Sequence, residues 1–195
     1  NCPGFGSVAK YIATSTLEAS LDVKSMCETS TKVFILEVMG RHAGWLAASS
    51  GVIKNTPKDA PHLILLPEIQ FDQSLFLKRV KETIIKCGYC VIVASEGIKD
   101  SKNKFLSDSG LKDSFGHAQL GGVAPVLSSI ITNKLKYKVH WAVSDYLQRA
   151  ARHIGSRVDV EQAYAIGYES IKAAKLGINN ICLLYTSPSP RDATL

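Results

Sequence analysis

Three short runs of apolar residues follow one another along the chain, separated by longer segments in which apolar residues recur every three or four positions. The runs lie at 33–36, 62–66 and 90–94, and the first is predicted to extend as a strand to Met39. Strands that are apolar on both faces are typical of a parallel sheet buried between two layers. Helices are predicted before the first run, at about 7–24, and between the runs, at about 44–53 and 72–87. The pattern therefore predicts an α/β fold, a parallel sheet with helices on both faces.

The region after the third run is less regular. Residues 99–119 are rich in Ser, Asp, Asn and Gly, which predicts a mobile loop. A helix is predicted at 125–135, and the alternation of polar and apolar residues at 139–143 favours a further strand.

The last predicted helix has a capping-box spacing, because Gln162 stands three positions after Asp159. We expect this helix to begin at Asp159 and to end at Gly177. Its core-facing stripe is predicted to consist of Val160, Ala163, Gly167, Ile171 and Ala174. A short strand is predicted at 181–184, and the Ser/Pro-rich residues 185–195 are predicted to be a non-native or disordered tail.

Composition narrows the class of protein. The 195 residues are 46% hydrophobic and 21% charged, as in ordinary globular domains. The net charge of +6 is scattered and no basic tract is interleaved with aromatic residues, so a nucleic-acid partner is not expected. No apolar stretch approaches the roughly 20 residues that cross a bilayer, so no membrane partner is expected. The five cysteines lack the spacing of a disulfide framework, which predicts reduced thiols and a cytoplasmic location.

Cys87 and Cys90 form a CxxC pair, which raises the question of a redox or zinc site. A redox pair places its first cysteine at the amino end of a helix. Here Cys87 is predicted to end a helix, with Gly88 as its left-handed cap and Cys90 as the first residue of a strand. A zinc site would need a second pair of ligands, and none is suitably spaced.

Arg41 follows the first predicted strand and stands between two glycines, Gly40 and Gly44. Open α/β sheets bind ligands at the carboxyl ends of their strands. The planar guanidinium suits phosphate, so we expect a buried anionic substrate here. The alternative is an arginine paired with a structural carboxylate.

The other two strands also end in polar residues, Glu68 after the second and Glu96 after the third. A cation and two carboxylates on one sheet edge suit a phosphorylated polyol, whose hydroxyl groups would donate to a carboxylate. Glu96 is the better candidate because Gly97 allows the backbone to approach closely. Glu68 fits equally well as a cap on a neighbouring helix or as the partner of a lysine.

Two further segments are candidates for binding an anion. Tyr146, Arg149, Arg152 and His153 recur at helical spacing, although a solvated cationic helix face has the same pattern. The glycines of 3–7 precede a helix and could form an anion nest at its amino end. No dinucleotide fingerprint or Walker lysine is present, which argues against a Rossmann oxidoreductase.

A shared sequence pattern is found in four separate segments of the chain, at 3–11, 37–47, 95–97 and 146–149. In this order they resemble the phosphofructokinase family. The pyrophosphate-dependent branch of the family is the most similar in two of these segments, Gly-Phe-Gly-Ser-Val-Ala-Lys-Tyr and Met-Gly-Arg-His-Ala-Gly-Trp. The resemblance implies a phosphofructokinase-like fold of which this chain is the sugar-phosphate half only. It also implies phosphoryl transfer from pyrophosphate to the 1-hydroxyl of fructose 6-phosphate in glycolysis, with Mg²⁺ held by ligands upstream of this chain.

The resemblance assigns roles to eight residues. Substrate-binding roles fall to Met39, Gly40, Arg41, Glu96, Tyr146, Arg149, Lys32 and His140. Arg41 would also neutralise charge near the transferred group, Glu96 would hold ring hydroxyls, and Arg149 would hold the 6-phosphate. Lys32 stands where the ATP-dependent relatives carry an arginine that reaches into the site of a neighbouring subunit, and His140 stands where an arginine for the 6-phosphate is common. Lysine lacks the arginine fork, and histidine is charged only part of the time at neutral pH.

The resemblance also implies a division of the chain. Residues 1–148 would be mainly the sugar-phosphate domain, and 149–184 would be a helix and strand returning to the phosphate-donor domain. The donor loop and the catalytic aspartate precede the first segment in the family, so we expect these 195 residues alone to be inactive. A homo-oligomer is expected. The alternatives are an ATP-dependent phosphofructokinase and a non-catalytic regulatory subunit that binds sugar phosphate.

Overall fold

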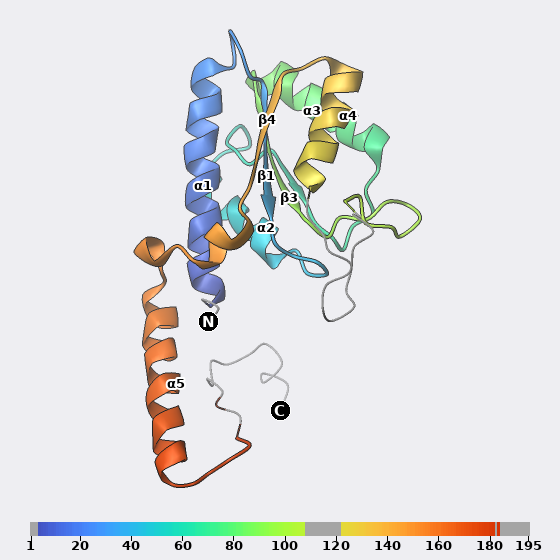
Figure 1. Ribbon diagram of the computed structural model, residues 1–195. Helices are drawn as coiled ribbons and strands as arrows, with labels where there is room; N and C mark the ends of the chain where they lie inside the picture. The colour runs from blue at the N-terminus through green and yellow to red at the C-terminus, as the bar shows by residue number, and fades with distance from the viewer. Residues whose placement is uncertain (1–3, 108–121, 182, 184–195) are drawn as a thin grey trace.

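The computed structural model describes residues 4–107, 122–181 and 183 (Figure 1). Its sheet contains four parallel strands in the order β2-β3-β1-β4. Their bounds are β1 Val33–Val38, β2 Leu63–Leu65, β3 Cys90–Ser95 and β4 Val139–Val143. The strands β1, β2 and β3 coincide with the three apolar runs, and β4 coincides with the predicted fourth strand. The parallel sheet predicted from the sequence is therefore confirmed.

The two central strands end level with each other. In the register of β1 and β3, Val33 lies opposite Cys90 and Val38 lies opposite Ser95. The segments that leave these strands, beginning at Met39 and Glu96, therefore start side by side at the carboxyl edge of the sheet.

Helices cover both faces of the sheet (Figure 1). On one face lie α1 (Phe5–Met26), α2 (Trp45–Ser49) and the 3₁₀ helix η1 (Ser50–Ile53); on the other lie α3 (Gln73–Cys87) and α4 (Val123–Leu135). The first layer packs Val8, Ile12 and Ala47 on Leu36, Val38 and Val93. The second packs Phe76, Val80, Ile84, Leu127 and Ile131 on Val33, Ile35, Cys90 and Ile92. The predicted layers are confirmed.

The helix α3 ends as the sequence predicts. Asp72 caps its start by accepting from the backbone N–H of Leu75 at 2.9 Å, and Gly88 ends it with φ +85°. Cys90 is then the first residue of β3 and is fully buried. Burial raises the pKa of the Cys90 thiol, so the reactive thiolate is disfavoured. The Cys87–Cys90 pair therefore joins a helix to a strand.

The polar segment after β3 is more ordered than the sequence predicts as far as it is described. Lys99 pairs with Phe105 in a short antiparallel bridge. Between them the Asp100 carboxylate accepts from the backbone N–H groups of Lys102 and Lys104 at 2.8 and 2.9 Å. An aspartate that accepts from the backbone of its own turn favours one local conformation, so the predicted loop contains a defined turn as far as Ser107. The rest of the predicted loop lies outside the described residues.

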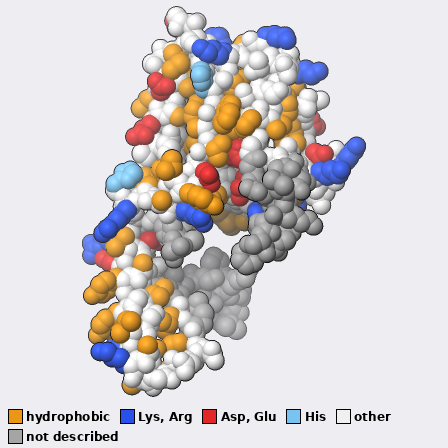
Figure 2. All heavy atoms as spheres, in the orientation of Figure 1, with side chains coloured by type: hydrophobic (Ala, Val, Ile, Leu, Met, Phe, Trp, Pro, Cys, Tyr) orange, Lys and Arg blue, Asp and Glu red, His pale blue; other side chains and the backbone are white. Residues whose placement is uncertain are grey.

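The C-terminal part leaves the body of the fold after β4. Two 3₁₀ helices, η2 (Asp145–Arg149) and η3 (Arg152–Ile154), lead into α5 (Arg157–Lys175). Figure 1 shows α5 extending away from the sheet, and Figure 2 shows hydrophobic side chains gathered along it. The predicted core stripe of α5 is exposed at every position, and Ala173 is its one buried residue. The prediction of a buried stripe is wrong for the described part of the chain, because no element there covers this face.

The predicted cap of α5 is also wrong. The helix is preceded by Ser156, which places Asp159 inside its first turn. The Asp159 carboxylate instead accepts from the backbone N–H and the hydroxyl of Ser7, both at 2.6 Å, at the start of α1. A β-carbon at Gly4 would collide with this carboxylate. The anion nest predicted at 3–7 is thus filled, in its described part, by an aspartate of the same chain.

Two remaining predictions concern the end of the chain. The strand predicted at 181–184 lies partly outside the described residues, and Ile181 and Leu183 themselves are not in a strand. The tail at 185–195 lies wholly outside them. Within the described part of the chain, every helix is too short or too polar to cross a bilayer.

Candidate functional site

The segments that follow β1 and β3 are joined by direct bonds. The backbone N–H of Gly40 donates to the Glu96 carboxylate at 3.2 Å, and the Ser95 hydroxyl donates to the Gly40 carbonyl oxygen. Ser95 is fully buried and Glu96 is partly buried. The sequence-predicted meeting of the Met39–Arg41 segment with Glu96 is therefore present in the structure.

Two glycines make this close approach possible. Gly40 has φ +145°, and a β-carbon there would lie 2.7 Å from the Ala43 carbonyl oxygen and 2.8 Å from the Ser95 hydroxyl. A β-carbon at Gly97 would collide with the carbonyl oxygens of Arg41 and Gly40. Only hydrogen fits at either position. The backbone that carries Arg41 is therefore pressed against the backbone that carries Glu96.

A third segment reaches the same edge from β4. The side-chain oxygen of Gln148, in η2, accepts from the backbone N–H of Met39 at 3.2 Å. The neighbouring Arg149 guanidinium stacks on the Tyr146 ring, 4.3 Å from its centroid. Arg149 and Arg152 also line a hollow of about 260 Å³ beside the first turn of α5. The structure thus brings η2, the turn that carries Tyr146 and Arg149, to the segment after β1.

The single helical face predicted for Tyr146, Arg149, Arg152 and His153 is wrong. The segment forms two separate 3₁₀ turns, with a break at 150–151. Positions three apart lie above each other in a 3₁₀ turn, which explains why Arg149 reaches Tyr146 within η2. Arg152 and His153 belong to the second turn.

Glu68 has the structural role that the sequence left open. Its carboxylate accepts from the backbone N–H of Gly44 at 2.7 Å, at the start of α2. A β-carbon at Gly44 would lie 2.8 Å from this carboxylate. A negative charge is favourable at the amino end of a helix, so Glu68 caps α2.

The structure does not bring Lys32 and His140 to Arg41. Lys32 precedes β1, at the opposite end of the sheet, and its ammonium donates to the Cys27 carbonyl oxygen at 2.7 Å. His140 lies opposite Phe34 in the register of β4 and β1. Phe34 is four residues from the end of β1, a distance of about 13 Å along the strand. His140 is exposed on the edge strand.

Glu37 is a buried carboxylate that the sequence analysis did not single out. It is 1% exposed, and its two oxygens accept from the backbone N–H groups of Gly122 at 2.9 Å and Ala124 at 2.8 Å. Burial raises the pKa of Glu37, and the two N–H groups oppose this shift. The signal was available, because a charged residue inside a strand buried on both faces needs polar partners.

Side chains that commonly bind metal ions are scattered over the described part of the chain. They contain no group of three or more His, Cys, Asp or Glu side chains arranged to hold a metal ion. Both oxygens of Glu37 are taken by backbone N–H groups, and Glu96 accepts from Gly40.

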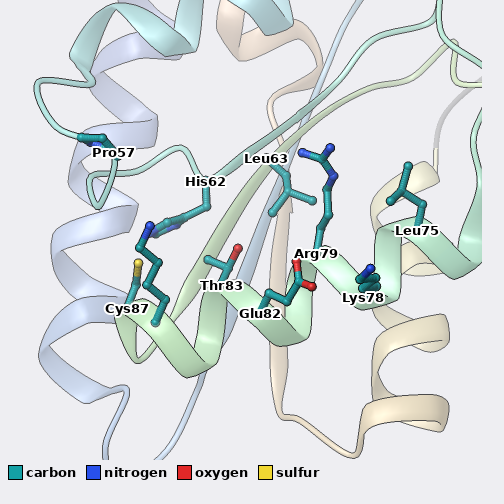
Figure 3. A pocket seen from close by; sticks show the side chains of 10 residues that line it. Pro57, His62, Leu63, Leu75, Lys78, Arg79, Glu82, Thr83 and Cys87 are labelled. Carbon is teal, nitrogen blue, oxygen red and sulfur yellow. The ribbon is translucent and has the colours of Figure 1, made fainter.

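A hollow of about 360 Å³ lies between α3 and the region around β2, away from the predicted site residues. Figure 3 shows Lys78, Arg79 and Glu82 lining it from α3, with His62 on the opposite side. The Nδ1 atom of His62 accepts from the Val91 backbone N–H at 3.0 Å, so the Nε2–H faces the Lys58 carbonyl oxygen at 3.2 Å. Burial lowers the pKa of His62. This histidine is a neutral structural residue.

Comparison with known proteins places these features in a family. A family profile described as "Phosphofructokinase" matches residues 1–174. The "Pyrophosphate--fructose 6-phosphate 1-phosphotransferase" of Halomonas elongata is 62% identical over 179 residues, which cover 92% of this chain and 43% of that protein. The protein of the same name from Xanthomonas campestris is 56% identical and is matched over 43% of its length.

A solved structure agrees. The crystal structure of a pyrophosphate-dependent phosphofructokinase from Marinobacter aquaeolei matches with a TM-score of 0.74 and 56% identity, over 91% of this chain and 41% of that one. The chain thus spans less than half the length of these relatives. Over nearly all of its own length it shares their fold and sequence, and it belongs to the phosphofructokinase family.

Proposed function

We propose that this chain is the sugar-phosphate half of a pyrophosphate-dependent phosphofructokinase, which transfers a phosphoryl group from pyrophosphate to the 1-hydroxyl of fructose 6-phosphate. The observation that carries the proposal is the joining of three segments at one sheet edge. The Gly40–Glu96 and Met39–Gln148 hydrogen bonds hold together the residues that the family resemblance assigns to the substrate. High identity to relatives named for this reaction supports pyrophosphate as the donor over ATP.

Each residue at this edge suits one part of the substrate. Arg41 would bind phosphate and neutralise charge on the transferred group, since a guanidinium presents a fork of donors to phosphate oxygens. Glu96 would accept hydrogen bonds from ring hydroxyls. Tyr146 and Arg149 would hold the 6-phosphate, because the Tyr146 ring stacks on the Arg149 guanidinium and fixes its orientation. Met39 and Gly40 would shape the backbone beside the sugar.

The rest of the machinery would come from outside these residues. Phosphoryl transfer needs Mg²⁺, a base for the hydroxyl proton and a cradle for the donor. We expect the Mg²⁺ ligands and the catalytic aspartate in a donor domain, with residues 1–148 forming mainly the sugar-phosphate domain. The exposed apolar face of α5 would pack on that donor domain, which gives 149–184 its role as the returning segment. The chain alone would then be inactive, and the complete enzyme would act in cytoplasmic glycolysis.

The positions of Lys32 and His140 are consistent with a homo-oligomer in which subunits share their sites. Both lie away from Arg41, and His140 is exposed on the edge strand β4. They would therefore serve the site of a neighbouring subunit rather than the site that contains Arg41.

Binding of fructose 6-phosphate to this chain tests the site directly. Isothermal titration calorimetry should detect binding that Arg41→Ala weakens by tenfold or more, while Arg157→Ala, on exposed α5, leaves it unchanged. No binding by the unmodified chain, at any concentration that the measurement reaches, would contradict the proposed site.

A chimera tests the reaction and the donor. The matched segment of the Halomonas elongata relative is replaced by this chain, and turnover is measured with pyrophosphate and with ATP. Pyrophosphate-dependent turnover by the chimera, with none by the chain alone, supports the proposal. Turnover with ATP only would favour an ATP-dependent enzyme, and binding without turnover would favour a regulatory subunit.

A further inference from the structure

Gln148 is a buried amide whose two ends bind two different segments. Its side chain is among the largest that are fully buried, with 2% exposure. The Oε1 atom accepts from the Met39 backbone N–H at 3.2 Å, and the Nε2 atom donates to the Asp145 carbonyl oxygen at 2.8 Å. A buried amide keeps this position only while its donor and acceptor are satisfied, because an unpaired buried polar group is costly.

The amide stands where the sheet ladder between β1 and β4 stops. The last paired residues of these strands are Glu37 and Val143, and the Ser144 N–H then donates to the Glu37 carbonyl oxygen at 2.9 Å. Beyond this point η2 turns away from β1. The Gln148 side chain instead accepts from the Met39 N–H, which lies beyond the last residue of β1 that pairs with β4.

The turn that Gln148 closes has an unusual backbone. Asp145 has φ +36°, a value that residues with a β-carbon rarely adopt. The Gln148 amide holds the carbonyl oxygen of this same residue. The orientation of η2, and with it the stacked pair of Tyr146 and Arg149, is therefore coupled to the backbone of Met39.

We propose that Gln148 is a positioning residue that sets the spacing between the Met39–Arg41 segment and the Tyr146–Arg149 pair. This inference rests on the proposed function, in which one substrate is held by both segments. Fructose 6-phosphate carries its phosphate at one end and its reacting hydroxyl at the other. A fixed spacing between the two segments lets a single molecule satisfy both at once, without the entropy cost of ordering them on binding.

The test compares a ligand that spans both segments with one that does not. Gln148→Met has a side chain of similar length without the two hydrogen bonds. We expect it to weaken fructose 6-phosphate binding by about tenfold and to change the affinity for inorganic phosphate by less than about twofold, measured by NMR titration of the full chain. An equal loss for both ligands, or no loss for either, would overturn the positioning role.

A conservative variant gives a second readout. In Gln148→Glu the ionised carboxylate still accepts from Met39 but repels the Asp145 carbonyl oxygen. Protonation restores a donor toward Asp145, so the affinity of this variant for fructose 6-phosphate should recover toward that of the unmodified chain as the pH falls. The unmodified chain, titrated at the same pH values, corrects for protonation of the ligand. Parallel pH profiles for the two proteins would contradict the inference.

A control separates positioning from stability. Thr16, on α1, is also fully buried, and its hydroxyl donates to the Ile12 carbonyl oxygen at 2.7 Å. Thr16→Val should lower the melting temperature without changing the ratio of the two affinities. In the absence of ligand, Gln148→Met should also shift the NMR amide signals of both Met39 and Arg149. A shift at one segment only would overturn the coupling, whereas failure of the unmodified chain to bind fructose 6-phosphate would instead overturn the proposed function.

Discussion

The helices α4 and α5 have comparable sequence patterns and opposite surroundings. In α4, Val123, Ala124, Leu127 and Ile131 are all fully buried against the sheet. In α5, Tyr164 and Ile171 are 78% and 61% exposed. Periodicity predicts which side of a helix is apolar, but a partner decides whether that side is buried. The apolar face of α5 is exposed in the described part of the chain, whereas the apolar face of α4 is buried against the sheet.

The largest expected difference between the two helices comes from truncating one apolar side chain in each. Leu127→Ala should lower the free energy of unfolding by about 2–5 kcal/mol, because it leaves a cavity in the core. Ile171→Ala should change it by less than about 0.5 kcal/mol, because the side chain is exposed. Urea unfolding of the chain measures both. Equal losses would mean that α5 is covered in solution.

Two glycine-to-alanine substitutions, one at the sheet edge and one on α5, are expected to have opposite effects. Gly97→Ala has no room against the Arg41 carbonyl oxygen, so it should cost about 1–3 kcal/mol and weaken fructose 6-phosphate binding at least tenfold. Gly167→Ala meets nothing within 4 Å and should stabilise α5 by about 0.5–1 kcal/mol. Calorimetric melting and titration distinguish the two. Normal binding by Gly97→Ala would contradict the close backbone contact.

The carboxylate at the start of α4 should affect the dependence of stability on pH. Burial raises the pKa of Glu37 above its usual value of 4.5, so the folded chain keeps this proton up to a higher pH than the unfolded chain does. Its contribution to stability is complete below about pH 4.5 and is lost as the pH rises through the raised value. Glu37→Gln should remove this loss. Urea midpoints measured between pH 4.5 and 7.5 should therefore fall less steeply with rising pH in the variant, and identical slopes would count against a raised pKa.

The smallest effect is expected at Asp145, where the chain leaves the sheet and continues toward α5. Asp145 follows β4 and has φ +36°, which glycine adopts at lower cost. Asp145→Gly should raise the free energy of unfolding by up to about 1 kcal/mol and leave fructose 6-phosphate binding within about twofold, because the Gln148 bond is to the backbone carbonyl. A loss of stability would show that the aspartate side chain has a role of its own.

Features that depend on neighbours along the chain were predicted well. The strands follow from their apolar runs, and Asp72 and Gly88 bound α3 as their residue types suggest. The meeting of Gly40 and Glu96 also followed, because parallel strands present their carboxyl ends at one edge.

Features that depend on a distant partner were not predicted. Asp159 matches a local capping box, yet its carboxylate binds Ser7, 152 positions away in sequence. Nothing in the local sequence distinguishes Gln148, which bridges to Met39, from an exposed glutamine. A capping pattern records which side chains can accept from a backbone N–H, but the fold decides which N–H is nearest. The substrate-binding roles assigned to the site residues stay predictions.

Among the described residues, the α-helices that pack on the sheet share one further property, because each begins beside a carboxylate of this same chain. The pairs are α1 with Asp159, α2 with Glu68, α3 with Asp72 and α4 with Glu37. The partial positive charge at the start of each helix is thus already matched by a built-in counter-ion. In the proposed site, the charge of a bound phosphate would therefore be matched by guanidinium side chains rather than by helix dipoles. Arginine-to-lysine exchange, which keeps the charge and removes the fork, should for that reason weaken binding far more here than in folds that cradle phosphate with backbone amides.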